Sequence, residues 1–123
     1  MAKGNNQKLK LLYLTKIFME KTDESHALTL AEITAQLNAY EVTADRKTLY
    51  LDFEELKRYG LDIVSEQCGK TVVYHLASRQ FELAELKLLV DSVQSAKFIT
   101  EKKSNSLIKK LESLVSEHEA KQL

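Results

Sequence analysis

The chain has 123 residues, of which 18 are basic and 18 are acidic, so its formal net charge is zero. It contains no proline, no tryptophan, three glycines and one cysteine. This length suits one domain, or a small domain with an appendage, and an apolar share of 44% excludes a wholly disordered chain. The absence of proline predicts a helix-rich protein, because proline inside a helix costs about 3 kcal/mol.

Several other classes of protein are excluded by the sequence. The apolar runs are too short to span a membrane, and residues 1–7 lack the apolar core of a signal peptide. The single Cys68 can form neither an internal disulfide nor a zinc cluster. We interpret it as a free thiol in a turn of a cytoplasmic protein. The balanced charge gives no global attraction to nucleic acid, so any nucleic-acid site must be local.

The chain begins with two predicted helices. The first spans about residues 6–21, where apolar side chains cover most of the helix circumference, which predicts burial on more than one side. The second begins at Thr29, which forms the capping-box pattern with Glu32. It is short and ends near Ala39, before a brief connector.

A third helix follows the connector and begins at Asp45 or Thr43, either of which can cap it. It ends before Gly60, a residue typical of helix C-termini. The i, i+4, i+7 spacing of its apolar residues predicts a buried stripe of Leu49, Phe53 and Leu56.

The hydrophobic period then changes from helix to strand and back. Residues 62–66 are predicted to form a strand, residues 67–70 a turn and residues 71–76 a second strand, which together make a β-hairpin. The helical period returns at Phe81.

The C-terminal part of the chain predicts a helical hairpin. Its last helix opens at a Thr100 cap, and its apolar stripe continues through Leu114 and Val115 to a chain end without a C-cap. We therefore expect two parts, residues 1–78 and residues 79–123.

The order of helix, short helix, helix and hairpin predicts a winged helix-turn-helix. In that fold the third helix lies in the DNA major groove and the hairpin reaches the DNA backbone or minor groove. The expected fold class is thus mainly α (α+β), a winged helix-turn-helix followed by a helical hairpin. Arg46, Lys47, Thr48 and Tyr50 lie in the first two turns of the third helix, the part that touches base edges. Arginine can pair with guanine, and the other three side chains can bind phosphates.

Each residue at the start of this helix also has a structural interpretation. Arg46 and Lys47 can be an ordinary solvated helix start, and Thr48 can simply cap its own helix. Tyr50 can pack against the hairpin. Leu51 can touch a thymine methyl group or pack in the core.

Three further residues are candidates for contact with the DNA backbone. Lys70 and Thr71, near the tip of the hairpin, can bind phosphate, although a lysine in a turn is usually only solvated. The hydroxyl of Thr29 is first of all a helix cap, and the amides that follow it can hold a phosphate.

The third helix also carries three acids, Asp52, Glu54 and Glu55. We expect them to lie away from the DNA or to pair with Lys57 and Arg58 at helical spacing. Acids facing the duplex would argue against DNA binding.

Five stretches of the chain carry a resemblance to a known family. Residues 45–56 read DRKTLYLDFEEL. Together with residues 29–33 and 59–63, they resemble the N-terminal winged helix of bacterial WYL-domain transcriptional regulators. The pattern of that family resembles Asp-Arg-Arg/Lys-Thr-Ile/Leu-Tyr-Arg-Asp-Ile/Phe-Glu-x-Leu. Residues 81–95 and 98–104 resemble the helical linker that follows the winged helix in that family. The resemblance implies a regulator that binds double-stranded DNA.

The chain departs from the family in two respects. Leu51 stands where family members usually have arginine, which removes a DNA contact. The WYL domain, a small β-barrel that resembles an effector sensor, would follow after Leu123. The resemblance therefore implies that the chain is the DNA-binding and linker half of a longer regulator, whose effector binds a domain outside it.

The apolar stripe after Phe81 is wider than one helical hairpin needs, and with the apolar first helix it predicts a homodimer. Dimers suit helix-turn-helix proteins, because two recognition helices then meet half-sites about one DNA turn apart. The alternative function is a winged-helix module that binds a protein and no DNA, favoured by the zero net charge and by Leu51.

An enzyme is not expected. The sequence places no nucleophile beside a base and shows no carboxylate pair or metal cluster. His26, His75 and His118 lie far apart in sequence. We therefore expect double-stranded DNA and a second copy of the chain as partners, without a cofactor, a metal or a membrane.

Overall fold

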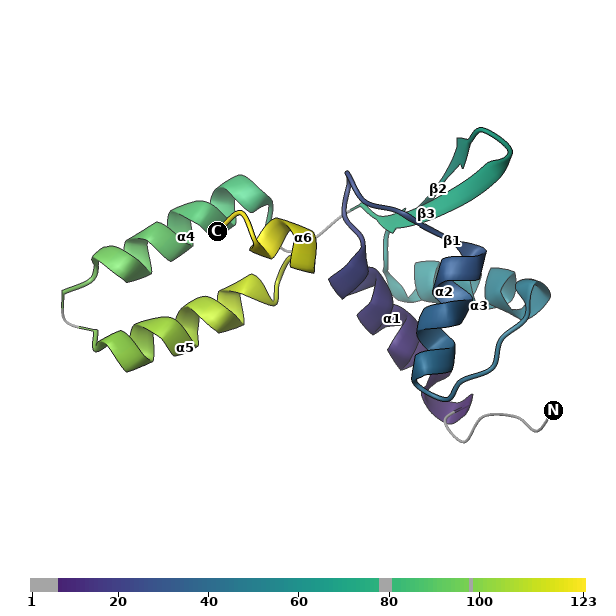
Figure 1. The fold of residues 1–123 in the computed structure, drawn as a ribbon, viewed down its shortest axis with the longest axis horizontal. Coiled ribbons are helices and arrows are strands. Elements are labelled where there is room, and N and C mark those ends of the chain that lie inside the picture. The colour runs from purple at the N-terminus through teal and green to yellow at the C-terminus, as the bar shows by residue number, and fades with distance from the viewer. Residues whose placement is uncertain (1–6, 78–80, 98) are drawn as a thin grey trace. The chain divides into compact units, whose positions relative to one another are not determined.

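The computed structural model describes residues 7–77, 81–97 and 99–123. The chain divides into two compact units, Met1–Ser78 and Arg79–Leu123, both drawn in Figure 1. Among the described residues helices predominate, accompanied by one three-stranded antiparallel sheet. This confirms the expected mainly α (α+β) fold class, while the winged helix-turn-helix stays a prediction.

The N-terminal unit contains three α-helices, and each begins close to the predicted residue. The capping box before the second helix is confirmed, since the backbone N–H of Glu32 donates to the Thr29 hydroxyl at 3.1 Å and the Thr29 N–H donates to the Glu32 carboxylate at 2.9 Å. The elements of this unit are η1 (Gln7–Leu9), α1 (Lys10–Lys21), β1 (Leu28–Thr29), α2 (Leu30–Ala39), α3 (Arg46–Tyr59), β2 (Ile63–Cys68) and β3 (Thr71–Leu76).

The predicted hairpin consists of β2 and β3, but its turn is shorter than expected. The register pairs Cys68 with Thr71, so only Gly69 and Lys70 make the turn. The prediction of a turn over residues 67–70, with Cys68 inside it, is therefore wrong. Gly69 has a φ of 64°, and a left-handed glycine lets a two-residue turn follow the twist of the strands. In Figure 1 the far end of this hairpin projects beyond the three helices.

A third strand was not predicted. The two-residue strand β1 pairs with β3 through Leu28 opposite Tyr74 and Thr29 opposite Val73, which gives the sheet order β1-β3-β2. Two residues are too few to show the alternation by which a strand is recognised.

Helices and sheet enclose one hydrophobic core. The ring of Phe53 lies between those of Phe18 and Tyr74, with centroid distances of 5.5 and 5.0 Å. The predicted stripe of α3 is buried, as expected. The buried apolar residues of this core are Leu14, Ile17, Phe18, Ile33, Leu37, Val42, Leu49, Phe53, Leu56, Ile63, Tyr74 and Leu76.

Helix α1 is not buried on more than one side, so that prediction is wrong. Its buried residues share one face, toward α2, α3 and β3. Leu12 points away from that face and is exposed, and Leu11 is exposed although helical spacing places it on the side of Leu14 and Phe18.

The C-terminal unit contains α4 (Leu83–Ser95), α5 (Glu101–Glu112) and α6 (Glu117–Ala120). Helices α4 and α5 pack side by side, as the predicted helical hairpin requires, and the Thr100 hydroxyl caps α5. The expectation of one last helix through Leu114 and Val115 to the chain end is wrong. The backbone leaves the helix after Glu112, and Ser116 caps the short α6.

None of the described helices combines the length and the apolar character needed to cross a membrane.

Candidate nucleic-acid interface

The start of α3 is held by a reciprocal cap. The Asp45 carboxylate accepts a hydrogen bond from the Thr48 N–H at 2.9 Å, and the Thr48 hydroxyl lies 3.4 Å from the Asp45 N–H. The backbone hydrogen bond from Thr48 is the main reason that the pKa of Asp45 is lowered, and the Thr48 hydroxyl and the charge of Lys10 add to it. Thr48 therefore acts as a cap, as its structural interpretation predicted.

Lys10 of α1 contacts two residues in the first half of α3. Its ammonium group lies 2.7 Å from the Asp52 carboxylate and 3.3 Å from the Thr48 hydroxyl. The two charged side chains are mostly buried, with exposed fractions of 12% for Lys10 and 21% for Asp52. Asp52 is thus directed toward α1 and away from the exposed side of α3. The sequence could not reveal this contact, because it joins two helices far apart in the chain.

Two basic side chains stand at the first turn of α3. Arg46 and Lys47 are exposed, and neither forms an ion pair with an acid in the part of the chain that the structure describes. Helical spacing places Tyr50 and Leu51 one turn further along the same side. Leu51 exposes 65% of its surface, so its core-packing alternative is wrong.

Tyr50 connects this exposed side to the hairpin. Burial raises the pKa of Tyr74 on β3, the neighbouring Tyr50 phenol raises it further, and the charge of Arg46 opposes the shift. Tyr50 nevertheless exposes 44% of its surface. It therefore contacts the hairpin and remains accessible to a ligand.

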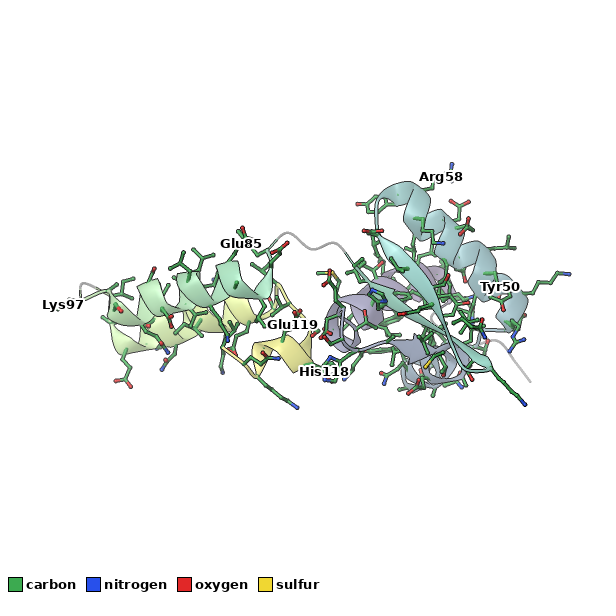
Figure 2. All side chains as sticks on the ribbon, turned by 90° about the horizontal axis from the view of Figure 1, so that it is seen from above. Tyr50, Arg58, Glu85, Lys97, His118 and Glu119 are labelled. Carbon is green, nitrogen blue, oxygen red and sulfur yellow. The ribbon has the colours of Figure 1, made fainter. Side chains whose placement is uncertain are left out.

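The second half of α3 is electrically balanced. Glu54 pairs with Lys57 at 3.0 Å and Glu55 pairs with Arg58 at 2.5 Å, as the helical spacing predicted. Glu54 lies one turn after Tyr50 on the exposed side, whereas Asp52 does not. Figure 2 shows Arg58 pointing into solvent at the other end of the helix from Tyr50. On α3, positive charge without an acidic partner among the described residues is therefore confined to the first turn.

The other three predicted contact residues lie on neighbouring elements. Thr29 is the N-cap of α2 and also belongs to β1, where it pairs with Val73 of β3. Lys70 and Thr71 are exposed at the tip of the hairpin. The sheet thus links the start of α2 to the strand that leads to this tip.

A metal centre does not form among residues 7–77, 81–97 and 99–123, where no three histidine, cysteine, aspartate or glutamate side chains come close enough to hold an ion. The described surface at α3 offers hydrogen-bond donors, cations and one apolar side chain instead. Such a set can bind a polyanion and read base edges.

Comparison with known proteins yields no relative: no family model, no curated protein and no solved structure matches the chain. The resemblance to WYL-domain regulators therefore rests on the sequence motifs alone.

Proposed function

We propose that the chain is the DNA-binding part of a transcriptional regulator of the WYL type. Its N-terminal unit acts as a winged helix-turn-helix, with α3 as recognition helix in the major groove and the β2–β3 hairpin as wing. The observation that carries the proposal is the capped first turn of α3, where the exposed Arg46 and Lys47 have no acidic partner among the residues that the structure describes. The N-terminal residues of a recognition helix are those that reach base edges.

In this proposal the residues of α3 make different kinds of contact with the DNA. Arg46 pairs with a guanine, while Lys47 and Tyr50 bind phosphates. Leu51 touches a thymine methyl group. Thr48 has the structural one of its two predicted roles, because its N–H and hydroxyl form the cap with Asp45 and its hydroxyl also contacts Lys10.

Contacts on either side of α3 complete the proposed interface. Lys70 and Thr71 bind phosphate from the wing, and the amides after Thr29 bind phosphate at the start of α2. The C-terminal unit serves as the linker that pairs two protomers. An effector binds a further domain, as the family resemblance implies.

One other function has a specific observation in its favour. The side of α3 that carries Lys47 and Tyr50 also carries the exposed Leu51 and the acidic Glu54. An apolar residue and an acid at this place would suit a protein partner better than a duplex. The alternative is thus a winged-helix module that binds protein and no DNA.

A salt-dependent DNA titration separates the two functions. We expect duplex DNA to bind at low salt, with log K falling linearly as log salt concentration rises. Lys47→Ala should flatten the slope by about 0.9, the value for one lost phosphate contact. Arg46→Ala should cost roughly 1–3 kcal/mol of binding if it reads a base.

Lys97→Ala is the matched control, because it removes one exposed lysine from the loop between α4 and α5. It should leave both the affinity and the slope close to those of the parent protein. No binding to any duplex at low salt, including the DNA upstream of the protein's own gene, would favour the protein-binding alternative.

A further inference from the structure

The lysines of α5 gather on one face of that helix, and all of them are exposed. Seven residues make almost two whole helical turns, so Lys109 lies nearly in line with Lys102, about 10 Å further along the axis. Lys110 follows Lys103 in the same way. Ser106 is exposed between the two rows. We call these five residues the basic face of α5.

The positive charge of the basic face is not balanced by nearby acids. Helical spacing places Glu101 and Glu112, the acids of α5, on another side of the helix. Within the described segments of the chain, none of the four lysines forms an ion pair with an acid, whereas Lys10 and Lys57 of the N-terminal unit do. The basic face therefore attracts anions.

A hollow lies along one edge of the basic face. Its volume is about 440 Å³, and the residues that line it are Ile99, Thr100, Lys103, Ser106, Leu107 and Lys110. Ammonium and hydroxyl groups are among the donors that bind phosphate oxygens in complexes of proteins with DNA. The hollow thus adds a place for a phosphate group to a surface that already carries the matching charge.

We propose that the basic face of α5 binds the phosphate backbone of double-stranded DNA, as a second contact surface outside the N-terminal unit. Lysine acts as a point charge on phosphate, and a duplex offers one negative charge per roughly 1.7 Å of its axis. Backbone contacts hold a protein on the duplex without reading its sequence. The inference rests on the proposed function in one respect, that DNA is the polyanion.

The residues of α5 favour a duplex over other anionic partners. The helix contains no aromatic residue, whereas single strands stack their bases on aromatic side chains and protein interfaces rely on tyrosine, tryptophan and arginine. A helix that lies on a membrane needs an exposed apolar face. In α5 the apolar Ile108 and Leu111 are instead half-buried on the side that packs against α4 (Figure 1).

A salt titration of the full chain tests this surface, with a duplex of the DNA upstream of the protein's own gene as the probe. Replacing Lys103 and Lys110 together by glutamine should flatten the slope of log K against log salt by about 0.9 for each lost phosphate contact. Replacing both by arginine keeps the charge and should preserve the slope. Because both side chains are exposed, thermal unfolding should be the same in all these proteins.

The double variant Lys87→Gln, Lys97→Gln is the matched control, because it removes two exposed lysines of the same unit that lie outside the basic face. Its slope should stay close to that of the parent protein. Equal flattening by the control and by the double variant Lys103→Gln, Lys110→Gln overturns the proposal. An unchanged slope in the latter variant overturns it as well.

A second duplex of the same length and base composition, in scrambled order, separates backbone contacts from base contacts. Because its phosphates are the same, loss of Lys103 and Lys110 should weaken binding to both duplexes by the same factor. A loss confined to one duplex contradicts a backbone contact. The proposal is also overturned if the glutamine variant binds duplexes normally but no longer binds a single strand or phosphatidylserine vesicles that the parent protein binds.

Failure of this inference and failure of the proposed function give different results. If Arg46→Ala and Lys47→Ala weaken duplex binding but the loss of Lys103 and Lys110 does not, the basic face is not a DNA contact and the role of α3 stands. The reverse result keeps the basic face and overturns α3 as the recognition helix. A parent protein that binds no duplex at low salt overturns both.

Discussion

The hydroxyl of Thr22 accepts a hydrogen bond from the backbone N–H of Leu76 at 3.0 Å, although the two residues are 54 positions apart. The same hydroxyl donates to the Phe18 carbonyl at 2.7 Å. Leu76 lies beyond the part of β3 that pairs with the two-residue β1. Thr22 therefore supplies the acceptor that a longer first strand would have supplied, and it joins the end of α1 to the sheet.

Replacing Thr22 with valine should destabilise the protein by roughly 1–3 kcal/mol, because the buried N–H of Leu76 would lose its acceptor. Denaturant unfolding measures the loss, and amide hydrogen exchange should become faster at Leu76. Thr22→Ser keeps the hydroxyl and is the control, so its Leu76 amide should stay protected. Equal protection of Leu76 in the valine and serine variants would contradict this account.

Asp45 should make the stability of the protein depend on acid pH. Its pKa is lowered in the folded state, chiefly by the hydrogen bond from the Thr48 N–H, so its contribution is present above the unfolded pKa of about 3.9. That contribution is lost as the pH falls through the folded pKa. Asp45→Asn keeps a capping oxygen but no longer titrates.

The advantage of the parent protein over Asp45→Asn should therefore be present at neutral pH and shrink as the pH falls below about 4. Thermal unfolding of both proteins across this range measures the difference. At neutral pH, Asp45→Ala should destabilise the protein more than Asp45→Asn does, since alanine removes the capping oxygen entirely. A parent-to-asparagine difference that stays constant with pH would rule out the carboxylate as its source.

Glu41 occupies a backbone conformation that favours glycine. Its φ is 62°, and its N–H and that of Val42 donate to the carbonyls of Asn38 and Leu37, which closes the end of α2. Glu41→Gly should stabilise the protein by about 0.5–1 kcal/mol, because glycine adopts this conformation without strain. Glu41→Ala removes the same charge but keeps the Cβ atom, so chemical denaturation should show no such gain for it.

Leu51→Arg tests the proposed DNA contact at the position where the resembled family usually has arginine. Because position 51 is exposed, the new cation can reach a phosphate. DNA binding should tighten, and the slope of log K against log salt should become more negative by about 0.9. Leu88→Arg adds the same charge at an exposed leucine of α4 and should have a smaller effect on the slope. Equal effects of the two variants would indicate non-specific attraction.

The helix starts could be predicted because their causes are local. Thr29, Asp45 and Thr100 each cap a helix by accepting the N–H three residues later, so cap and partner lie within one short stretch of sequence. The buried stripe of α3 was predicted for the same reason, since its period is set by the helix itself.

Two of the errors concern features that distant segments of the chain decide. The burial of the leucines of α1 depends on which elements pack beside that helix. The fully buried residues of α1 lie on one face, while Leu11 and Leu12 are exposed. Strand β1 exists because β3 offers it partners. The prediction of one long last helix is wrong for a local reason instead, because Ser116 caps a new short helix within the predicted range.

By itself, the sequence determined the order of the elements, the caps and the basic first turn of the third helix, because each depends on residues within a few positions of one another. Only the tertiary structure decided that Lys10 holds Asp52 away from that turn, that Leu51 is exposed, and that Leu12 and Tyr59 flank an open groove. These facts depend on how α1 packs against α3, and such contacts between distant segments leave no periodic signal in the chain.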